Sequence, residues 1–294
     1  MDTHKKNIIM SPFNLLYKLS PELELKLLFR LKQGYKLNIN NPKTFNEKLQ
    51  WIKLYDKNPL MPKCVDKYKV REYVKSVGCE EILNELYWEG FNPEAIPFDK
   101  LPKKFVIKVT HGSTYNIIVT DKDKLDRQDA INKCKVWMNE KFLPCYGEWF
   151  YGIEKPRVIV EKYLEDEKVK GELLDYKVFC FNGQPKLIDV HCGRFGNHRR
   201  NVYDLDWNFL ENVYFKYEHF QGIERPKELE KLLEYAKKLS SNFNHVRVDF
   251  LIVNGKIYFG ELTFTNGAGL DSIKPYEFDK KMGDWLKLPI DKKQ

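Results

Sequence analysis

The sequence predicts an α+β protein with helices in its first part and strands in the rest. Three observations support this class. Apolar residues recur at helical spacing up to about residue 77. From about residue 104 they alternate with polar residues, as in half-buried strands. Two of these alternating segments contain an Asn-Gly pair, the strongest short-range signal for a β-hairpin. A run of helices followed by a run of strands is typical of the α+β class.

Start and stop signals delimit the helices expected first. A helical segment is expected over residues 12–33, with a start signal at Ser20-Pro21 and a stop at Gly34. Thr44 and Glu47 form a capping-box pattern at the start of a helix over 44–55. A third helix is expected over 64–77. The later elements are strands at 104–110, 116–120 and 157–164, hairpins at 175–193 and 246–264, and helices at 126–143 and 226–242.

Composition restricts the classes of protein. The 294-residue chain is 43% hydrophobic and 14% aromatic, so it can bury a sizeable core. Its net charge of +8 favours acidic partners such as nucleotides, anionic glycans or an anionic membrane. The charge is spread without a long basic block, so nucleic acid is not an expected partner.

Targeting signals and cysteine spacing bear on location. The six cysteines show no CxxC or zinc spacing, as expected of reduced thiols in the cytoplasm. The N-terminal apolar run is too short for a signal peptide, and no stretch is long enough to span a membrane. A cytoplasmic location is therefore expected. A peripheral association with the inner face of the membrane through the basic N-terminal helix stays open.

The last hairpin places an acid in each strand, Asp249 and Glu261. A two-residue Asn254-Gly255 loop would send them to opposite faces, because side chains alternate along a strand. A loop extended by Lys256 pairs them directly, pairs Leu251 with Phe259, and separates polar from apolar residues better. We therefore favour the three-residue loop.

Opposed carboxylates on a sheet repel each other, so a cation is expected between them. Oxygen ligands without histidine or cysteine suit Mg²⁺. The favoured register also pairs Arg247 with Thr263. The alternative is a solvated strand face on which Arg247 neutralises Asp249.

Two further features could bind a nucleotide. Lys108 lies mid-strand, opposite the apolar face of 104–110, and precedes a small-residue loop whose backbone N–H groups could approach phosphate oxygens. An edge-strand lysine is the alternative. The strand over 157–164 ends in a polar segment at residues 161–163, where backbone groups could contact an adenine edge. An ordinary strand end is the alternative there.

The order of these features resembles the ATP-grasp superfamily. Six sequence segments resemble its TupA-like branch, which is named for teichuronopeptide biosynthesis. They are "CVDKYKVREYV", "LPKKFVIKVTHGSTYNIIV", "RVIVEKYL", "DYKVFCFNGQPKLIDV", "NVYDLDWNFL" and "VRVDFLIVNGKIYFGELTFTNGAGL". The likeness runs from about residue 45 to 285. It implies two α+β lobes that sandwich a nucleotide, preceded by an N-terminal helical segment. The implied divisions are a helical segment (1–60), a pre-grasp segment (61–103), a small lobe or lid (104–160) and a core lobe with the metal site (161–294).

The resemblance implies ATP and Mg²⁺ as cofactors and assigns residues to them. Lys108 would contact phosphates, and Lys177 would make a second phosphate or hinge contact. The phosphate-covering loop would comprise His111, Gly112 and Ser113. The adenine hinge would comprise Glu161, Lys162, Tyr163 and Leu164. Asp249 and Glu261 would hold Mg²⁺, and Arg247 would act with Lys177 in catalysis by stabilising the transferred phosphoryl oxygens.

One departure from the family pattern concerns the metal. ATP-grasp enzymes usually carry Glu-x-Asn, whereas this chain has Glu261-Leu262-Thr263. Thr263 is a poorer metal ligand, so Asn266 is the expected source of the third oxygen, with Thr263 as the alternative.

The implied activity is an ATP-dependent carboxylate–amine ligase that forms an amide through an acylphosphate. The branch resemblance implies that an amino acid or other amine is attached to a carboxylate, such as a uronic acid, of a cell-surface polysaccharide or its nucleotide-sugar precursor. An association with polysaccharide assembly proteins stays open. The basic segment "RFGNHRRNVYDLDW" could bind that carboxylate through Arg194, His198, Arg199 and Arg200, with a solvated basic loop as the alternative.

Other function classes remain. A kinase could use the same ATP site without an amine step. The triplet Asp204-Leu205-Asp206 matches the DxD of metal-dependent glycosyltransferases, which holds Mn²⁺ and a sugar diphosphate. A basic module that binds anionic glycan would leave the opposed Asp249 and Glu261 unexplained.

Overall fold

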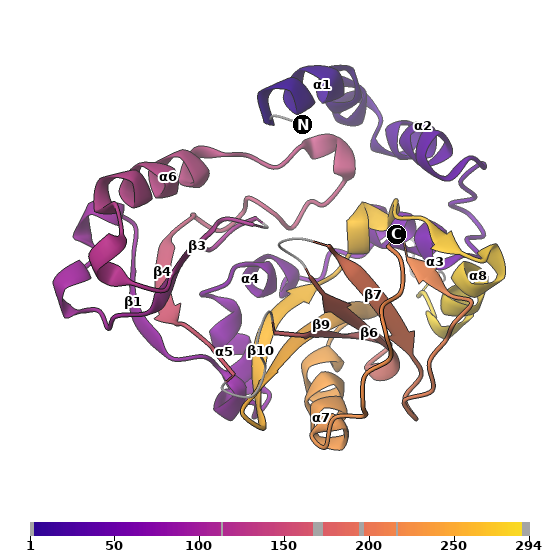
Figure 1. Cartoon of the computed structure of the whole chain (residues 1–294). Coiled ribbons are helices and arrows are strands. Elements are labelled where there is room, and N and C mark those ends of the chain that lie inside the picture. The colour runs from indigo at the N-terminus through magenta and orange to yellow at the C-terminus, as the bar shows by residue number, and fades with distance from the viewer. Residues whose placement is uncertain (1–2, 113, 167–172, 194–196, 216, 290–294) are drawn as a thin grey trace.

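The computed structural model describes residues 3–112, 114–166, 173–193, 197–215 and 217–289. Two antiparallel sheets form its framework (Figure 1). The first sheet has the strand order β1-β4-β2-β3, and the second has the order β10-β9-β5-β6-β7. A two-stranded sheet pairs β11 with β8. The strands are β1 (Leu86–Gly90), β2 (Phe105–Val109), β3 (Asn116–Val119), β4 (Val158–Lys162), β5 (Asp175–Phe181), β6 (Gln184–Cys192), β7 (Arg199–Tyr203), β8 (Tyr214–Phe215), β9 (His245–Val253), β10 (Lys256–Thr263) and β11 (Ile273–Lys274).

The helices cover these sheets and join them. They are α1 (Thr3–Leu19), α2 (Pro21–Gln33), α3 (Phe45–Tyr55), α4 (Met61–Val65), α5 (Val70–Ser76), α6 (Arg127–Asn139), α7 (Leu229–Ser240) and α8 (Tyr276–Trp285). Figure 1 shows α6 over the outer side of the first sheet, α7 below the second, and α4 between the two. Among the described residues, no helix combines the length and apolar character needed to cross a bilayer.

Two expected helices are divided in the structure. Ser20 has extended backbone angles and separates α1 from α2, because Pro21 fits the first turn of a helix and not its interior. The helix predicted over 64–77 is wrong between residues 66 and 69. There the Asp66 carboxylate accepts the N–H groups of Tyr68 and Lys69, an Asx turn that competes with helix continuation. The capping box at Thr44 and Glu47 is present as predicted.

The second sheet has two different faces. One packs on α7 through Val178, Val246 and Val248, all fully buried. The other face is apolar at one end, where Phe45 of α3 contacts Phe181 and the His245 ring at centroid distances of 5.5 and 4.8 Å. Further along the two strands this face becomes polar, at Arg247 and Asp249 of β9 and at Lys177 of β5. Helix α3 thus covers the apolar end of this face and leaves the polar end uncovered by α3.

A buried carboxyl group on α2 makes stability depend on pH. Neither oxygen of Glu24 has a hydrogen-bond partner within the described residues, and burial raises the pKa of this carboxyl to about 7, against the opposing effect of Lys53. Because the folded pKa is the higher one, ionisation removes stability as the pH rises from about 4.5 to 7. The free energy of unfolding of Glu24→Gln, measured relative to that of the wild type, should therefore increase by up to about 3 kcal/mol from pH 4.5 to pH 8. Urea denaturation at both pH values measures this, and an equal difference at both would contradict it.

The contact between α8 and the start of α3 requires a glycine. A Cβ atom at Gly283 would lie 2.0 Å from the Lys43 carbonyl oxygen, and backbone cannot yield as a flexible side chain can. Gly283→Ala should lower the free energy of unfolding by about 1–3 kcal/mol through overpacking. Gly222→Ala is the matched control, because a Cβ there meets nothing within 4 Å. Similar urea midpoints for the two variants would show that the helices separate without cost.

Candidate active site

The last hairpin pairs its two acidic residues as predicted, but through a different strand register near the turn. Glu261 lies directly opposite Asp249, as predicted, and Thr263 lies opposite Arg247. The predicted three-residue loop is wrong, since Val253 pairs with Lys256 and Leu251 pairs with Tyr258 instead of Phe259. A register shift between Phe259 and Glu261 supplies the extra residue.

The geometry of the turn and the bulge explains this outcome. Asn254 and Gly255 have φ values of 50° and 74°, the left-handed pair of a type I′ turn, whose twist suits a hairpin. The bulge falls at Gly260, where a Cβ atom would lie only 3.0 Å from the Asp249 carbonyl oxygen. A residue without a side chain thus lets the strand slip by one position.

The β5–β6 hairpin repeats this arrangement. It turns at Asn182-Gly183, and a shift between Phe179 and Cys180 places Lys177 opposite Asp189. On its other side, Lys177 lies opposite Asp249. A row of charged side chains therefore crosses the second sheet. Asp189 was not predicted, although its alternation with Ile188 and Val190 was a usable signal.

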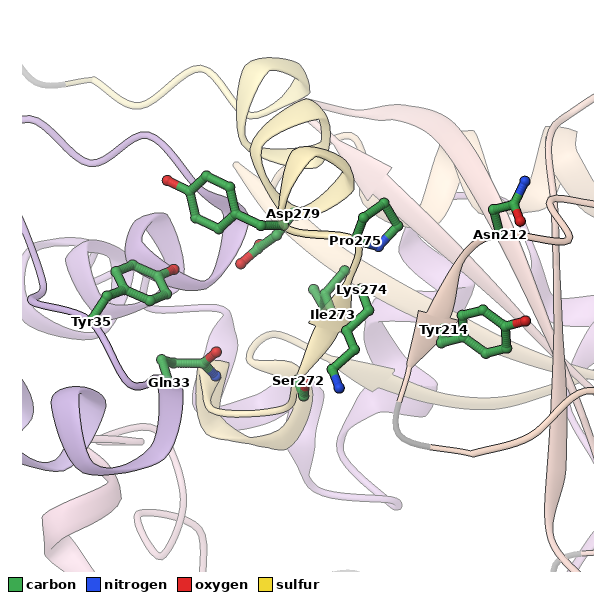
Figure 2. A pocket seen from close by; sticks show the side chains of 10 residues that line it. Gln33, Tyr35, Asn212, Tyr214, Ser272, Ile273, Lys274, Pro275 and Asp279 are labelled. Atoms are coloured by element: carbon green, nitrogen blue, oxygen red, sulfur yellow. The ribbon is translucent and has the colours of Figure 1, made fainter.

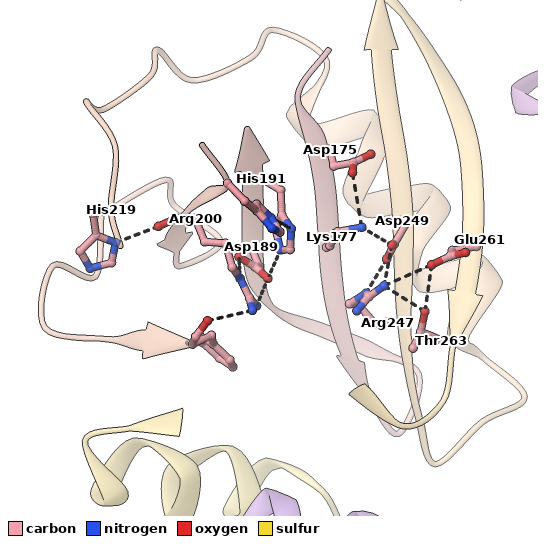
Figure 3. A network of polar contacts seen from close by, with 12 residues as sticks. Asp175, Lys177, Asp189, His191, Arg200, His219, Arg247, Asp249, Glu261 and Thr263 are labelled. Carbon is pink, nitrogen blue, oxygen red and sulfur yellow. Dashed lines mark hydrogen bonds and ion pairs between the residues drawn. The ribbon is translucent and has the colours of Figure 1, made fainter. Parts of the chain in front are cut away.

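A buried ion network holds Lys177, Arg247 and Asp249 together (Figure 3). Lys177 Nζ donates to Asp249 Oδ2 and lies 3.7 Å from the Asp175 carboxylate. The Arg247 Nε and Nη2 atoms each donate to Asp249 at 2.6 Å. Burial opposes ionisation of Asp249, but the two cations hold the pKa of its carboxyl below the usual value. The network is therefore charged at neutral pH.

The oxygen atoms near this network are of the kind that binds Mg²⁺. Asp249 is ionised, and the Glu261 side chain is 44% exposed and accepts long hydrogen bonds from Arg247 at 3.4 Å and from Thr263 at 3.5 Å. Asn266 Oδ1 is a buried oxygen without a hydrogen-bond partner in the described parts of the chain, but no hydrogen bond there joins it to Asp249 or Glu261. Within those parts there is also no cluster of three His, Cys, Asp or Glu side chains suited to a metal. Asp249 and Glu261 are thus the pair that fits, and the roles of both and of Asn266 stay predictions.

The first sheet contributes a second group of charges. Phe105, Ile107 and Val109 are buried, and Lys108 lies on the opposite face as predicted. Lys108 Nζ donates to Glu161 Oε2 at 2.8 Å, and Arg71 Nη1 donates to Glu161 Oε1 at 3.3 Å. The buried Glu161 carboxylate therefore positions Lys108, which is 31% exposed, and α5 supplies a second cation that the sequence analysis missed.

Lys67, between α4 and α5, connects the two groups. Its backbone N–H donates to the Thr110 carbonyl at 3.0 Å and its Nζ to the Gly112 carbonyl at 2.5 Å. Burial lowers the pKa of Lys67, and Glu261 of the second sheet is the first charge that opposes this, with Lys108 and Glu161 of the first sheet also acting on it. Charged side chains of both sheets therefore lie near enough to Lys67 to influence its charge.

The expected nucleotide loop is partly buried. His111 is 6% exposed, its Nε2 lies 3.0 Å from the Glu140 carbonyl oxygen, and burial lowers its pKa. Gly112 has a φ of 77°, which allows its carbonyl to face Lys67. Ser113 lies outside the described residues. Contacts of this loop with a nucleotide stay a prediction.

The expected hinge is hydrogen-bonded to the segment just before β1. The Lys162 N–H donates to the Glu85 carbonyl at 3.0 Å, and its carbonyl accepts from Asn84 at 2.9 Å, which leaves that oxygen one further lone pair. Tyr163 and Leu164 follow β4 and are half-buried. The Asn254 N–H donates to Asp166 at 2.7 Å, so the β9–β10 turn lies against the segment that follows the expected hinge.

The basic segment at β7 is divided among different environments. Arg200 is buried and its guanidinium bonds to Asp189 and, at 3.0 Å, to the Phe215 carbonyl. Arg199 points to the opposite face of the strand. Arg194 lies outside the described residues. Acceptor binding by these residues stays a prediction, and Arg200 already has strong partners within the chain.

His198 belongs to a hydrogen-bonded chain. Its Nε2 lies 2.9 Å from His191 Nδ1, and His191 Nε2 lies 2.8 Å from Asp189. Burial lowers the pKa of His191 to about 4, so its ring is neutral and donates to the Asp189 carboxylate, which can only accept. His191 Nδ1 then accepts a hydrogen bond from the His198 Nε2–H group. This chain fixes the tautomers of both rings.

The first aspartate of the DxD triplet stabilises the turn in which the triplet lies. Asp204 Oδ1 accepts the N–H groups of Asp206 and Asn208, and its Oδ2 accepts from the Asn208 amide at 2.9 Å. Both oxygens are thus engaged locally, which disfavours the glycosyltransferase interpretation.

Two antiparallel sheets, each carrying a group of charged side chains, and helices that cover them give the α+β architecture that the sequence predicts. A family model for TupA-like ATPgrasp proteins matches residues 47–287. The chain belongs to this family, and the predicted resemblance and fold class are confirmed.

Two solved ligase structures are similar to this chain at low identity. The D-alanine–D-alanine ligase from Bacillus anthracis complexed with ATP has 18% identity and a TM-score of 0.40, over 68% of this chain and 55% of that one. The L-amino acid ligase from Bacillus licheniformis has 14% identity and a TM-score of 0.48, over 86% of this chain and 57% of that one. The chain thus spans little more than half the length of these ligases. No curated protein matches the sequence significantly.

Proposed function

We propose that the protein is an ATP-dependent carboxylate–amine ligase that forms an amide through an acylphosphate. The observation that carries this proposal is that each sheet holds a lysine hydrogen-bonded to a buried carboxylate, Lys108 with Glu161 on the first sheet and Lys177 with Asp249 on the second. Phosphoryl transfer needs positioning and charge stabilisation more than covalent chemistry, and this site offers cations and carboxylates for both. Membership of the ATP-grasp family supports the same conclusion.

The proposed reaction has two steps. A substrate carboxylate oxygen attacks the γ-phosphorus of ATP, the bond to the β-phosphate oxygen breaks, and ADP leaves. An amine then attacks the acyl carbon, the acyl–oxygen bond breaks, and phosphate leaves with loss of a proton from nitrogen. A kinase would stop at a phosphorylated acceptor, which makes it a close variant.

The residues of this chain have separate roles in the proposal. Lys108 contacts phosphate oxygens and is positioned by Glu161. Lys177 and Arg247 stabilise the transferred phosphoryl group, and they also hold Asp249 in place. Asp249 and Glu261 would hold Mg²⁺, which neutralises phosphate charge when bound. Residues 161–164 bind the adenine.

The substrate class and surroundings belong to the same proposal. The carboxylate is part of a glycan or nucleotide-sugar of cell-surface polysaccharide biosynthesis, such as a uronic acid, and the amine is an amino acid or a similar compound. The protein works in the cytoplasm, in contact with the inner face of the membrane or with assembly proteins. The lid spans 104–160 and the core lobe 161–294.

Thermal stability in the presence of nucleotides tests the ATP site. Mg-ATP at about 100 times its Kd should add roughly 2.7 kcal/mol to the stability of the wild type. Glu261→Gln should lose most of this gain, because it removes the exposed carboxylate next to Asp249. UDP- and GDP-sugars with Mn²⁺ are the control ligands. Stabilisation by a nucleotide sugar alone would contradict the ligase proposal and favour a glycosyltransferase.

A further inference from the structure

A hollow of about 660 Å³ lies outside the proposed ATP site, between α2, β8, β11 and α8 (Figure 2). Volumes of this size are typical of small-molecule sites. None of the residues assigned above to the nucleotide, metal or acceptor lines it. The side chains that line it include Tyr35, Tyr214, Tyr276, Asn212, Ser272 and Lys274.

Aromatic rings form two walls of the hollow. Figure 2 shows Tyr35 and Tyr214 on opposite sides with Lys274 between them. The Tyr35 hydroxyl lies 3.0 Å from Thr44 Oγ1, and its ring meets the Tyr276 ring edge-on at 5.7 Å. The Tyr214 ring lies 4.5 Å from the His219 ring. These neighbours hold the walls in place while Tyr214 and Tyr276 stay 43% and 51% exposed.

The polar groups of the hollow include one available cation. Lys274 lies directly opposite Tyr214 across the β8–β11 pair, so both side chains point to the same side. Within the described parts of the chain, the side chains of Asn212, Ser272 and Lys274 have no hydrogen-bond partner. Asp279 is the acid of the lining, and its two oxygens accept the backbone and amide N–H groups of Asn46.

We propose that this hollow binds a saccharide that carries a carboxylate. Aromatic rings pack on the C–H faces of sugar rings, amide and hydroxyl groups bond to sugar hydroxyls, and Lys274 pairs with the carboxylate. Asp279 bonds to Asn46 and contributes to the floor. The biological sense of this inference rests on the proposed function, because the acidic sugar would belong to the glycan substrate.

Strand β8 connects the hollow with the charged face of the second sheet. Tyr214 lines the hollow, and the carbonyl of the next residue, Phe215, accepts from Arg200 at 3.0 Å. Arg200 in turn bonds to Asp189, which lies opposite Lys177. Strand β8 therefore contacts both the hollow and Arg200, which bonds to the polar row.

Saturation-transfer NMR with two matched disaccharides tests the inference. Cellobiouronic acid should receive saturation from the wild type and bind more tightly than uncharged cellobiose. Lys274→Gln should weaken cellobiouronic acid binding about two- to five-fold, the effect of one exposed charge pair, and leave cellobiose binding unchanged. Lys280→Gln is the control, because this exposed lysine of α8 does not line the hollow.

Each outcome decides the matter. No transfer to either sugar, or equal affinities in wild type and Lys274→Gln, would overturn the inference. Mg-ATP thermal shifts on the same samples keep the two proposals apart. Nucleotide stabilisation without sugar binding would reject the hollow alone, and sugar binding without nucleotide stabilisation would reject the ligase while the hollow stands.

Discussion

Replacing Asp249 by asparagine lowers the free energy of unfolding by about 3–5 kcal/mol, the largest stability effect that we expect in this chain. The Asp249 side chain is 4% exposed and accepts hydrogen bonds from both Lys177 and Arg247. Asparagine keeps the shape and removes the charge, so two buried cations lose their shared counter-ion. Urea denaturation at pH 7 measures the loss.

A double-mutant cycle separates this charge effect from a general loss of packing. Lys177→Met in the Asp249→Asn background should recover part of the stability, because it removes one uncompensated cation. Lys133→Met, which breaks an exposed pair with Asp129, is the control and should cost at most about 0.5 kcal/mol. Full additivity of the two core substitutions would contradict the network.

The same network predicts the pH dependence. The pKa of the Asp249 carboxyl is held below its unfolded value, mainly by Arg247 acting against burial. Its contribution is therefore present above the unfolded pKa and is lost as the pH falls through the folded one. The difference in free energy of unfolding between Asp249→Asn and the wild type should accordingly be smallest at acidic pH.

Replacing Lys108 by methionine should lower ATP turnover by about 10²–10³-fold, the largest effect on activity that we expect. Its ammonium group is the partly exposed cation of the first sheet, and methionine keeps most of the side-chain volume. Stability should change little, because Arg71 still pairs with Glu161. ADP release and the urea midpoint of the same preparation measure the two effects.

Lys104→Met is the matched control for this substitution. Lys104 lies four residues before Lys108, and its ammonium group pairs with the exposed Glu165. Its loss should leave turnover within about two-fold of the wild type, because exposed pairs contribute little. Equal losses of activity in both variants would indicate a general charge effect and would contradict a phosphate contact at Lys108.

Local patterns determined much of this protein without the structure. Apolar alternation identified β2 and assigned Lys108 to its polar face, and the two Asn-Gly pairs located both hairpins of the second sheet. Motif order was sufficient to indicate the family that the comparison confirms. These features depend on neighbours in the chain, where side-chain period and turn preference act directly.

Pairings between distant segments were decided only by the tertiary structure. The bulge at Gly260 and the shift before Cys180 move each strand by one residue, which sets the face on which Glu261 and Lys177 lie. The sequence reveals that an extra residue exists but not where it is placed, because turn and bulge absorb it equally well. Asp189 beside Lys177, and Lys67 between the sheets, depend on packing across the fold that no local spacing records.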